Sequence, residues 1–163
     1  TTTRCGVCGK GSIESRREAG CAMSLATSAV NREVIHLLPE TRRASQSAFE
    51  QTGGLHGAAL FDQKGNLEMT REDVGRHNAV DKLIGAAFLE RSLPLHDRVL
   101  MLSGRVSFEL VQKAVTAGIP IVAAVGAPSS LAIETALRFG MTLIGFLRGD
   151  HFNVYGGGAR VLS

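Results

Sequence analysis

The fold class is indicated by residues 99–147, which read VLMLSGRVSFELVQKAVTAGIPIVAAVGAPSSLAIETALRFGMTLIGFL. Three segments of this stretch are short and apolar, namely 99–102, 121–125 and 143–147. Two segments between them have a helical pattern, namely 107–117 and 128–139. Helices that alternate with fully apolar strands are typical of a largely parallel sheet covered on both faces. We therefore expect an α/β protein, a three-layer sandwich around a mostly parallel mixed sheet.

The boundaries of the two helices carry the usual sequence signals. Gly118 and Pro120 follow the first helix and would stop it. Pro128 stands in the first turn of the second helix and Gly140 at its end. The Gly-Gly-Gly run at 156–158 has no strand-turn-helix context, so we interpret it as a turn and not as a phosphate-binding loop.

The residues just before this stretch predict a hairpin and another helix. Apolar runs at 56–61 and 67–70 flank the turn-rich segment 62–66, which is typical of two antiparallel strands. The spacing i, i+3, i+4, i+7, i+8 then predicts an amphipathic helix from about Arg76 to Arg91. Its apolar positions are Val80, Leu83, Ile84, Ala87 and Phe88.

Residues 1–52 are interpreted as a cysteine loop and an N-terminal helical segment. We expect helices at 13–25 and 41–51, the second ended by Gly53-Gly54. Residues 53–163 are expected to form the α/β core. Since no repeat or linker separates the two parts, and 163 residues suit one core, we expect a single domain.

The composition favours a globular protein and argues against several classes of function. Hydrophobic residues make up 44% and charged residues 20% of the chain, and the mean hydropathy is near zero. The net charge of +3 is spread among acidic residues, which disfavours nucleic-acid binding. There is no apolar run of membrane-spanning length and no signal-peptide pattern, so we expect a cytoplasmic protein without a membrane segment.

Three loops follow the predicted parallel strands and contain groups that suit an anion. They are Ser103-Gly104-Arg105, the segment 126–130 with Ser129 and Ser130, and the segment 146–151. Ligands of open α/β sheets bind at the carboxyl ends of the strands, where amides and helix N-termini face them. The alternative interpretation is that these residues are helix caps and turns. Three loops of this kind together favour a nucleotide-like ligand, although no dinucleotide or P-loop glycine motif is present.

The segment 72–78 places Arg76 and His77 at the start of a predicted helix. Positive charge is unfavourable at a helix N-terminus unless an anion lies nearby. We therefore treat both residues as ligand candidates, while a capped helix start is the alternative.

Cys5 and Cys8 form a C-x-x-C pair within the glycine-rich stretch 5–11. The flanking Arg4 and Lys10 favour the thiolate, which is the nucleophilic form. Other interpretations stay open: a thioredoxin-like pair, although no strand is visible before the motif; a zinc site, although a second ligand pair is missing; or cysteines without function. Cys21 lies among small apolar residues and is expected to be a buried hydrophobe.

His56 stands where zinc-dependent nucleoside deaminases would carry the first histidine of an H-x-E signature. Position 58 is alanine and no second cysteine pair follows, which disfavours a zinc-dependent deaminase. We therefore expect no metal site. His36 and His96 are interpreted as ordinary surface or core-edge residues.

Five ordered motifs resemble the family of formate dehydrogenase accessory sulfurtransferases, the FdhD family. The motifs are CGVCGK at 5–10, GGLH at 53–56, EDVGRHNAVDK at 72–82, SGRVSFE at 103–109 and APSSLA at 127–132, and the resemblance extends over nearly the whole chain. The resemblance implies a cytidine-deaminase-like fold without zinc, and a homodimer.

The resemblance also implies a function and a site. Proteins of the family take sulfur from a cysteine desulfurase and pass it to the bis(molybdopterin guanine dinucleotide) molybdenum cofactor, Mo-bisMGD, for formate dehydrogenase. The persulfide cysteine corresponds to Cys5, with Cys8 as a helper. The cofactor-binding segment corresponds to Phe146, Leu147, Arg148, Gly149, Asp150 and His151. The alternatives are a cofactor chaperone without sulfur chemistry and, less favoured, a C-x-x-C disulfide oxidoreductase.

Overall fold

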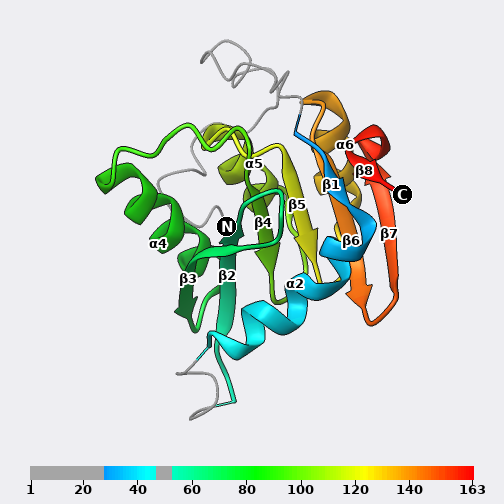
Figure 1. Ribbon diagram of the computed structural model, residues 1–163. Coiled ribbons are helices and arrows are strands. Elements are labelled where there is room, and N and C mark those ends of the chain that lie inside the picture. The colour runs from blue at the N-terminus through cyan, green and yellow to red at the C-terminus, as the bar shows by residue number, and fades with distance from the viewer. Residues whose placement is uncertain (1–27, 47–52) are drawn as a thin grey trace.

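The computed structural model describes residues 28–46 and 53–163, and these residues form a central six-stranded sheet (Figure 1). The strand order is β3-β2-β4-β5-β6-β7. The strands are β2 (His56–Phe61), β3 (Leu67–Asp73), β4 (Val99–Leu102), β5 (Ile121–Ala124), β6 (Thr142–Arg148) and β7 (His151–Gly156). Strands β4, β5 and β6 are parallel, while β2, β3 and β7 run antiparallel to their neighbours. The expected mixed sheet with a parallel centre is confirmed.

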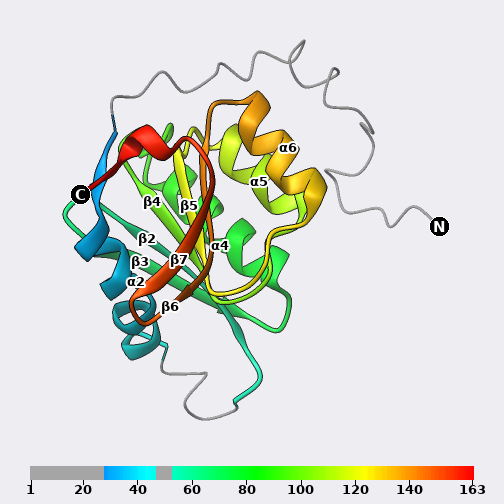
Figure 2. The same ribbon diagram turned by 90° about the vertical axis from the view of Figure 1, so that its right-hand side faces the viewer.

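Helices cover both faces of the sheet, as the apolar strands predicted. In the described part of the chain, α4 (Arg76–Leu89), α5 (Phe108–Thr116) and α6 (Ser130–Arg138) pack on one face. Helix α2 (Arg32–Ala44) packs on the opposite face. Figure 2 shows α2 on one side of the sheet and α5 and α6 on the other. The three-layer α/β class is therefore confirmed.

The two apolar cores explain why β4 is apolar throughout. Leu100 and Leu102 belong to the cluster beneath α4, α5 and α6, whereas Val99 and Met101 belong to the cluster beneath α2. Successive strand side chains point to opposite faces, so a strand buried on both sides cannot alternate with polar residues. Because β4, β5 and β6 are parallel, the segments that follow these three strands all begin at the same edge of the sheet.

The helix expected at 41–51 was placed too late in the chain. Helix α2 begins at Arg32 and ends at Ala44, and it contains Pro39 in its interior. Proline removes one helical hydrogen bond and crowds the preceding turn, which is why the sequence did not suggest a helix there. The burial of Ile35 and Leu38 against the sheet compensates for this cost. The helix expected at 13–25 lies outside the described residues, as do Cys5, Cys8 and Cys21.

The segment expected to be a loop after the last strand is instead part of a hairpin. Strand β6 continues to Arg148, Gly149 and Asp150 form the turn, and β7 runs back antiparallel. We call residues 146–151 the β6–β7 tip. The short strands β1 (Val30–Asn31) and β8 (Val161–Leu162) form a separate two-stranded parallel sheet. The 3-10 helix η1 (Gly158–Arg160) directly precedes β8.

None of the described helices is both long and apolar enough to cross a lipid bilayer.

Candidate functional site

The β6–β7 tip holds Phe146 in a strained conformation. Its φ angle is 54°, in the left-handed region, and its side chain is 44% exposed. Its N–H donates a hydrogen bond to the Gly126 carbonyl at 3.1 Å, which fixes the backbone there. A left-handed conformation costs a non-glycine residue about 1 to 2 kcal/mol. Strain of this kind, with an aromatic ring left in solvent, is typical of ligand sites.

The other residues of the tip differ in what they can offer a ligand. The Leu147 side chain is fully buried beneath α2, so this residue can contact a ligand only through its backbone. Its neighbours Arg148, Gly149, Asp150 and His151 are exposed. The Asp150 carboxylate lies against Nδ1 of the adjacent His151. The tip therefore presents an aromatic ring and a guanidinium group to solvent.

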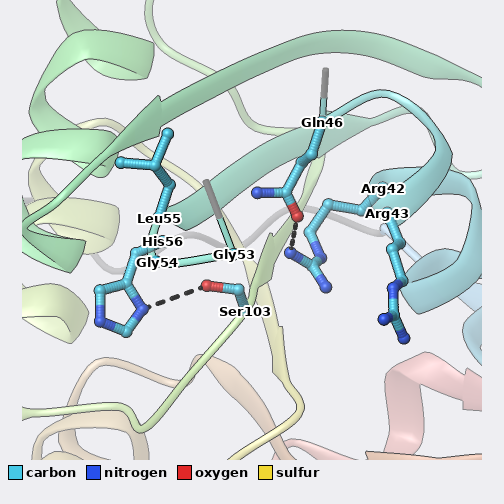
Figure 3. Close-up of a pocket in the computed structure, with 8 residues that line it drawn as sticks. All are labelled: Arg42, Arg43, Gln46, Gly53, Gly54, Leu55, His56 and Ser103. Atoms are coloured by element: carbon cyan, nitrogen blue, oxygen red, sulfur yellow. Dashed lines mark hydrogen bonds between the residues drawn. The ribbon is translucent and has the colours of Figure 1, made fainter. Parts of the chain in front are cut away.

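A pocket of about 380 Å³ lies at the same edge of the sheet, at the C-terminal end of α2 (Figure 3). It is lined by Arg42, Arg43, Gln46, Gly53, Gly54, Leu55, His56 and Ser103. We call it the α2 pocket. The arginines come from α2 on one side, while His56 and Ser103 stand on the opposite side. Its size is within the usual range for small-molecule sites.

A polar chain connects the α2 pocket to β3. The buried Arg42 guanidinium donates from Nη1 to Gln46 Oε1, and Gln46 Nε2 donates to Glu72 Oε1 at 3.1 Å. Burial, followed by the adjacent Arg43 charge, lowers the pKa of Arg42, and Glu72 opposes this effect. Among the described residues, Arg42 Nε has no hydrogen-bond acceptor. The pocket therefore contains a desolvated cation whose nearest acceptor is a neutral amide.

The opposite wall is fixed by the start of β2. The Gly57 N–H donates to Ser103 Oγ at 2.9 Å, and Ser103 Oγ lies 3.4 Å from His56 Nδ1. Ser103 was predicted to bind a ligand, and it does line the α2 pocket. The Ser103 hydroxyl also holds the start of β2 in place through its contacts with Gly57 and His56. Arg105, the other candidate of that loop, is exposed and is not among the lining residues.

The serines before α6 have different surroundings. Ser129 Oγ accepts a hydrogen bond from the Ala132 N–H at 3.2 Å, so its side chain caps α6. This is the structural alternative that the sequence left open for that loop. Ser130, the first residue of α6, is exposed.

Arg76 and His77 are the first two residues of α4, and His77 contacts the start of α5. His77 Nε2 lies 3.0 Å from Ser107 Oγ and 3.8 Å from Glu109 Oε2. Burial, together with the neighbouring Arg76 charge, lowers the pKa of His77. Neither residue lines the α2 pocket. The contacts of His77 link α4 to α5, whereas the buried Arg76 Nε has no hydrogen-bond acceptor among the described residues. The ligand role of both residues stays a prediction.

Asp73 explains the rest of the predicted helix start. It accepts hydrogen bonds from the Gly75 N–H and from Asn78 Nδ2, and it pairs with Lys82 at 2.5 Å. These contacts, with that to Lys82 the largest, lower the pKa of Asp73 to about 2. Much of the charged motif at 72–82 therefore builds the turn into α4.

The sequence missed Arg42, Arg43 and Gln46 as site residues. The available signal was the arginine pair placed shortly before Gly53-Gly54, but the misplaced helix gave it no position relative to the sheet. Within 28–46 and 53–163, no three His, Cys, Asp or Glu side chains come together as a metal site. The expected absence of zinc stays a prediction, which elemental analysis of the purified protein will decide.

The fold and the site define a three-layer α/β protein whose sheet edge combines an arginine-rich pocket with a strained hairpin tip. The model of the FdhD/NarQ family matches residues 1–162, so the chain belongs to this family.

Relatives and a solved structure agree with this assignment. The chain is 55% identical to the sulfur carrier protein FdhD of Streptomyces coelicolor, over 99% of this chain and 58% of that protein. It is 48% identical to the protein of the same name from Sulfurisphaera tokodaii, over 97% of this chain and 60% of that protein. The chain thus spans somewhat more than half the length of these relatives.

A crystal structure of a protein described as a formate dehydrogenase accessory protein, from Desulfotalea psychrophila, has a similar fold. The TM-score is 0.77 and the sequence identity is 34%, over 85% of this chain and 57% of that chain. The likeness to a cytidine deaminase is not tested by these comparisons and stays a prediction.

Proposed function

We propose that this chain is the part of a cytoplasmic sulfur carrier that receives sulfur on Cys5 as a persulfide and delivers it to Mo-bisMGD, the substrate, for formate dehydrogenase. The names of the relatives support the sulfur-carrier role. The observation that carries the proposal in this chain is the strained, exposed Phe146 at the tip that the family resemblance selects. The proposed partners are a cysteine desulfurase, formate dehydrogenase and a second copy of the chain.

The loading step is a thiol exchange at sulfur. The Cys5 thiolate attacks the outer sulfur of the donor's cysteine persulfide, so that one S–S bond forms on Cys5 while the donor's S–S bond breaks. The donor cysteine leaves as a thiolate. The positive charges of Arg4 and Lys10 favour the Cys5 thiolate that the attack requires.

The release step uses the second cysteine. The Cys8 thiolate attacks Cys5 Sγ and displaces the terminal sulfur as hydrosulfide, leaving a Cys5–Cys8 disulfide. Oxidation of the two thiols to the disulfide supplies the two electrons that reduce the terminal sulfur to hydrosulfide. A dithiol reductant of the cell then reduces the Cys5–Cys8 disulfide back to two thiols.

The substrate would dock at the carboxyl edge of the sheet. In this proposal the guanine ring stacks on Phe146, and the Arg148 guanidinium pairs with the phosphate nearest the ribose. Both side chains are exposed on the tip, which supports their availability to a ligand.

Mass spectrometry after incubation with a cysteine desulfurase and cysteine tests the sulfur chemistry. We expect one added sulfur atom on Cys5, its loss in Cys5→Ala, and its retention in the matched control Cys21→Ala. Formate dehydrogenase activation should be lost in Cys5→Ala and retained in Cys21→Ala. A chain that activates the dehydrogenase without gaining sulfur would be a cofactor chaperone, and a ready Cys5–Cys8 disulfide without sulfur gain would indicate an oxidoreductase. Either outcome overturns the proposal.

A further inference from the structure

His77, Ser107 and Glu109 form a hydrogen-bonded chain between the starts of α4 and α5. His77 Nε2 lies 3.0 Å from Ser107 Oγ but 3.8 Å from Glu109 Oε2, so the serine hydroxyl is the link. A hydrogen bond from Ser107 is the largest of the effects that lower the pKa of Glu109. A carboxylate can only accept, so Ser107 gives its single proton to Glu109. Ser107 Oγ must then accept from His77, which places the imidazole proton on Nε2.

The other ring nitrogen of His77 can accept a proton from a ligand. In this tautomer Nδ1 carries a lone pair, and no residue in the described part of the chain bonds to it. The side chain is 38% exposed, so a ligand can reach the ring. His77 therefore presents a base at the surface, and the chain through Ser107 to Glu109 stabilises the ring once it is protonated.

The charged groups around His77 keep its imidazole neutral. Burial, followed by the Arg76 charge, lowers the pKa of His77. On α5, Glu109 opposes this effect and Lys113 adds to it. Asp81 on α4 also opposes it, and Asp81 pairs with Lys113. A neutral imidazole is the form that accepts a proton near pH 7, and the positive charge of Arg76 beside it favours an anion formed at the ring.

Only some acids can give a proton to such a ring. Proton transfer is efficient when the donor and the acceptor have similar pKa values. A carboxylic acid, with a pKa of about 4, is already ionised near pH 7, and an aliphatic alcohol is too weak an acid. A thiol, with a pKa of about 8.5, is mostly protonated there and lies close to the value of about 6.5 for an ordinary histidine. The ring therefore suits an S–H group.

We infer that His77 Nδ1 accepts the proton of a thiol or persulfide group that docks beside the starts of α4 and α5, with Ser107 and Glu109 as positioning residues. The S–H bond breaks, the proton passes to Nδ1 and the electron pair stays on sulfur as the nucleophilic anion. The inference deepens the proposed function and rests on it for the identity of the sulfur acid. Helices α4 and α5 pack on the face of the sheet opposite α2, so this base lies apart from the α2 pocket.

Imidazole NMR signals test the geometry without any sulfur chemistry. We expect His77 to carry its proton on Nε2 and to titrate below about 6.5. Ser107→Ala should release this tautomer preference, and Ser107→Thr, which keeps the hydroxyl, should retain it. The matched control His96→Gln, at an exposed histidine, should leave the His77 signals unchanged. A proton on Nδ1 in the unmodified protein would overturn the inference.

A second measurement follows the same ring signals with a small thiol, 2-mercaptoethanol, and with ethylene glycol as the matched alcohol. The thiol alone should shift the His77 signals, and it should do so much less in Ser107→Ala. No response to the thiol, or an equal response to both compounds, rejects the site whatever the sulfur chemistry of Cys5.

The third measurement is the rate of sulfur loading on Cys5 against pH, with a cysteine desulfurase and cysteine. His77→Gln should slow loading about tenfold or more near pH 7, and the rate should recover above pH ~8.5, where thiols ionise without a base. His96→Gln should follow the unmodified protein. Normal loading in His77→Gln at all pH values would overturn the inference and leave the proposed function standing. If the unmodified protein loads no sulfur, the proposed function fails, and the two NMR measurements still decide whether His77 is a base for thiols.

Discussion

His36 on α2 holds the backbone of the β6–β7 tip through Gly149, whose carbonyl oxygen lies 2.9 Å from His36 Nδ1. A carbonyl can only accept, so the bond requires the proton on Nδ1. The same imidazole packs against Phe152, with ring centroids 5.0 Å apart and ring planes tilted by 49°, and the Arg32 guanidinium lies 5.0 Å from the centroid of the Phe152 ring. The N-terminal half of α2 therefore fixes the turn that carries the proposed cofactor segment.

Replacing His36 by alanine should loosen the tip without unfolding the protein. An exposed neutral hydrogen bond contributes about 0.5 to 1.5 kcal/mol, so the loss of stability should be small. Amide exchange at Gly149 and Asp150 should become faster, and GDP binding should weaken several-fold. The control is Glu40→Ala, a change at an exposed residue of the same helix. Unchanged exchange at the turn would show that His36 does not position it.

Replacing Phe146 by glycine should weaken GDP binding while leaving the stability of the protein nearly unchanged. Glycine adopts the left-handed region freely, so the change relieves about 1 to 2 kcal/mol of strain. The greater freedom of glycine in the unfolded chain, about 0.5 to 1 kcal/mol, offsets part of the gain. We expect little net change in thermal stability and a marked loss of GDP affinity. A large drop in melting temperature with unchanged affinity would mean that the ring is structural. Arg148→Ala, which removes charge and keeps the backbone, should weaken GDP binding about tenfold.

The Gln46 side chain packs so closely against Gly57 that it leaves no room for a side chain at position 57. A Cβ atom at position 57 would lie 2.4 Å from Gln46 Nε2, so Gly57→Ala must displace the amide that joins Arg42 to Glu72. We expect a loss of about 1 to 3 kcal/mol in the free energy of unfolding, measured by urea denaturation.

Two further variants check the cause of the Gly57 effect. Gly85→Ala lies in the exposed interior of α4 with open space around it, and it should stabilise the helix by up to about 1 kcal/mol. In a Gln46→Ala background the cost of Gly57→Ala should shrink, because the clash is removed. An undiminished cost there would assign the effect to β2 itself.

Asp73 should make stability depend on pH in the acid range. The contacts from Lys82, Gly75 and Asn78 lower its pKa to about 2, below the value of about 3.9 for an unfolded chain. Its stabilising contribution is therefore complete above pH ~4 and is lost as the pH falls towards 2. The difference in unfolding free energy between the protein and Asp73→Asn should shrink over this range. Lys82→Gln should reproduce part of the effect, and a constant difference from pH 5 to 2 would contradict it.

The chain order of helices and strands was predictable where the local signal was strong. Helix α4 was expected from Arg76 to about Arg91 and ends at Leu89, and α5 and α6 differ from expectation by one or two residues at each end. Apolar spacing and glycine or proline boundaries are local properties, so the sequence expresses them directly. Helix α2 was misplaced because Pro39 breaks the local pattern while burial against the sheet maintains the helix.

The sequence predicted where on the sheet the candidate site lies, but only some of the residues that form it. The sequence placed Ser103 and the 146–151 segment at one sheet edge, because parallel strands end on the same side. It left Ser129 as either a ligand residue or a helix cap, and the hydroxyl does cap α6, while the ligand role stays a prediction. It gave no reason to join Arg42 to His56, since the two residues come from separate elements and only meet across the pocket.

The sequence by itself determined the α/β class, the order of the central strands along the chain and the family motifs, because each depends on residues close together in the chain. The tertiary structure decided which face α2 covers, how its C-terminal arginines reach the edge of β4, and the left-handed backbone of Phe146. These features arise from contacts between residues far apart in sequence. His36 and Gly149, which are 113 positions apart, come into hydrogen-bond range only when α2 packs over the sheet.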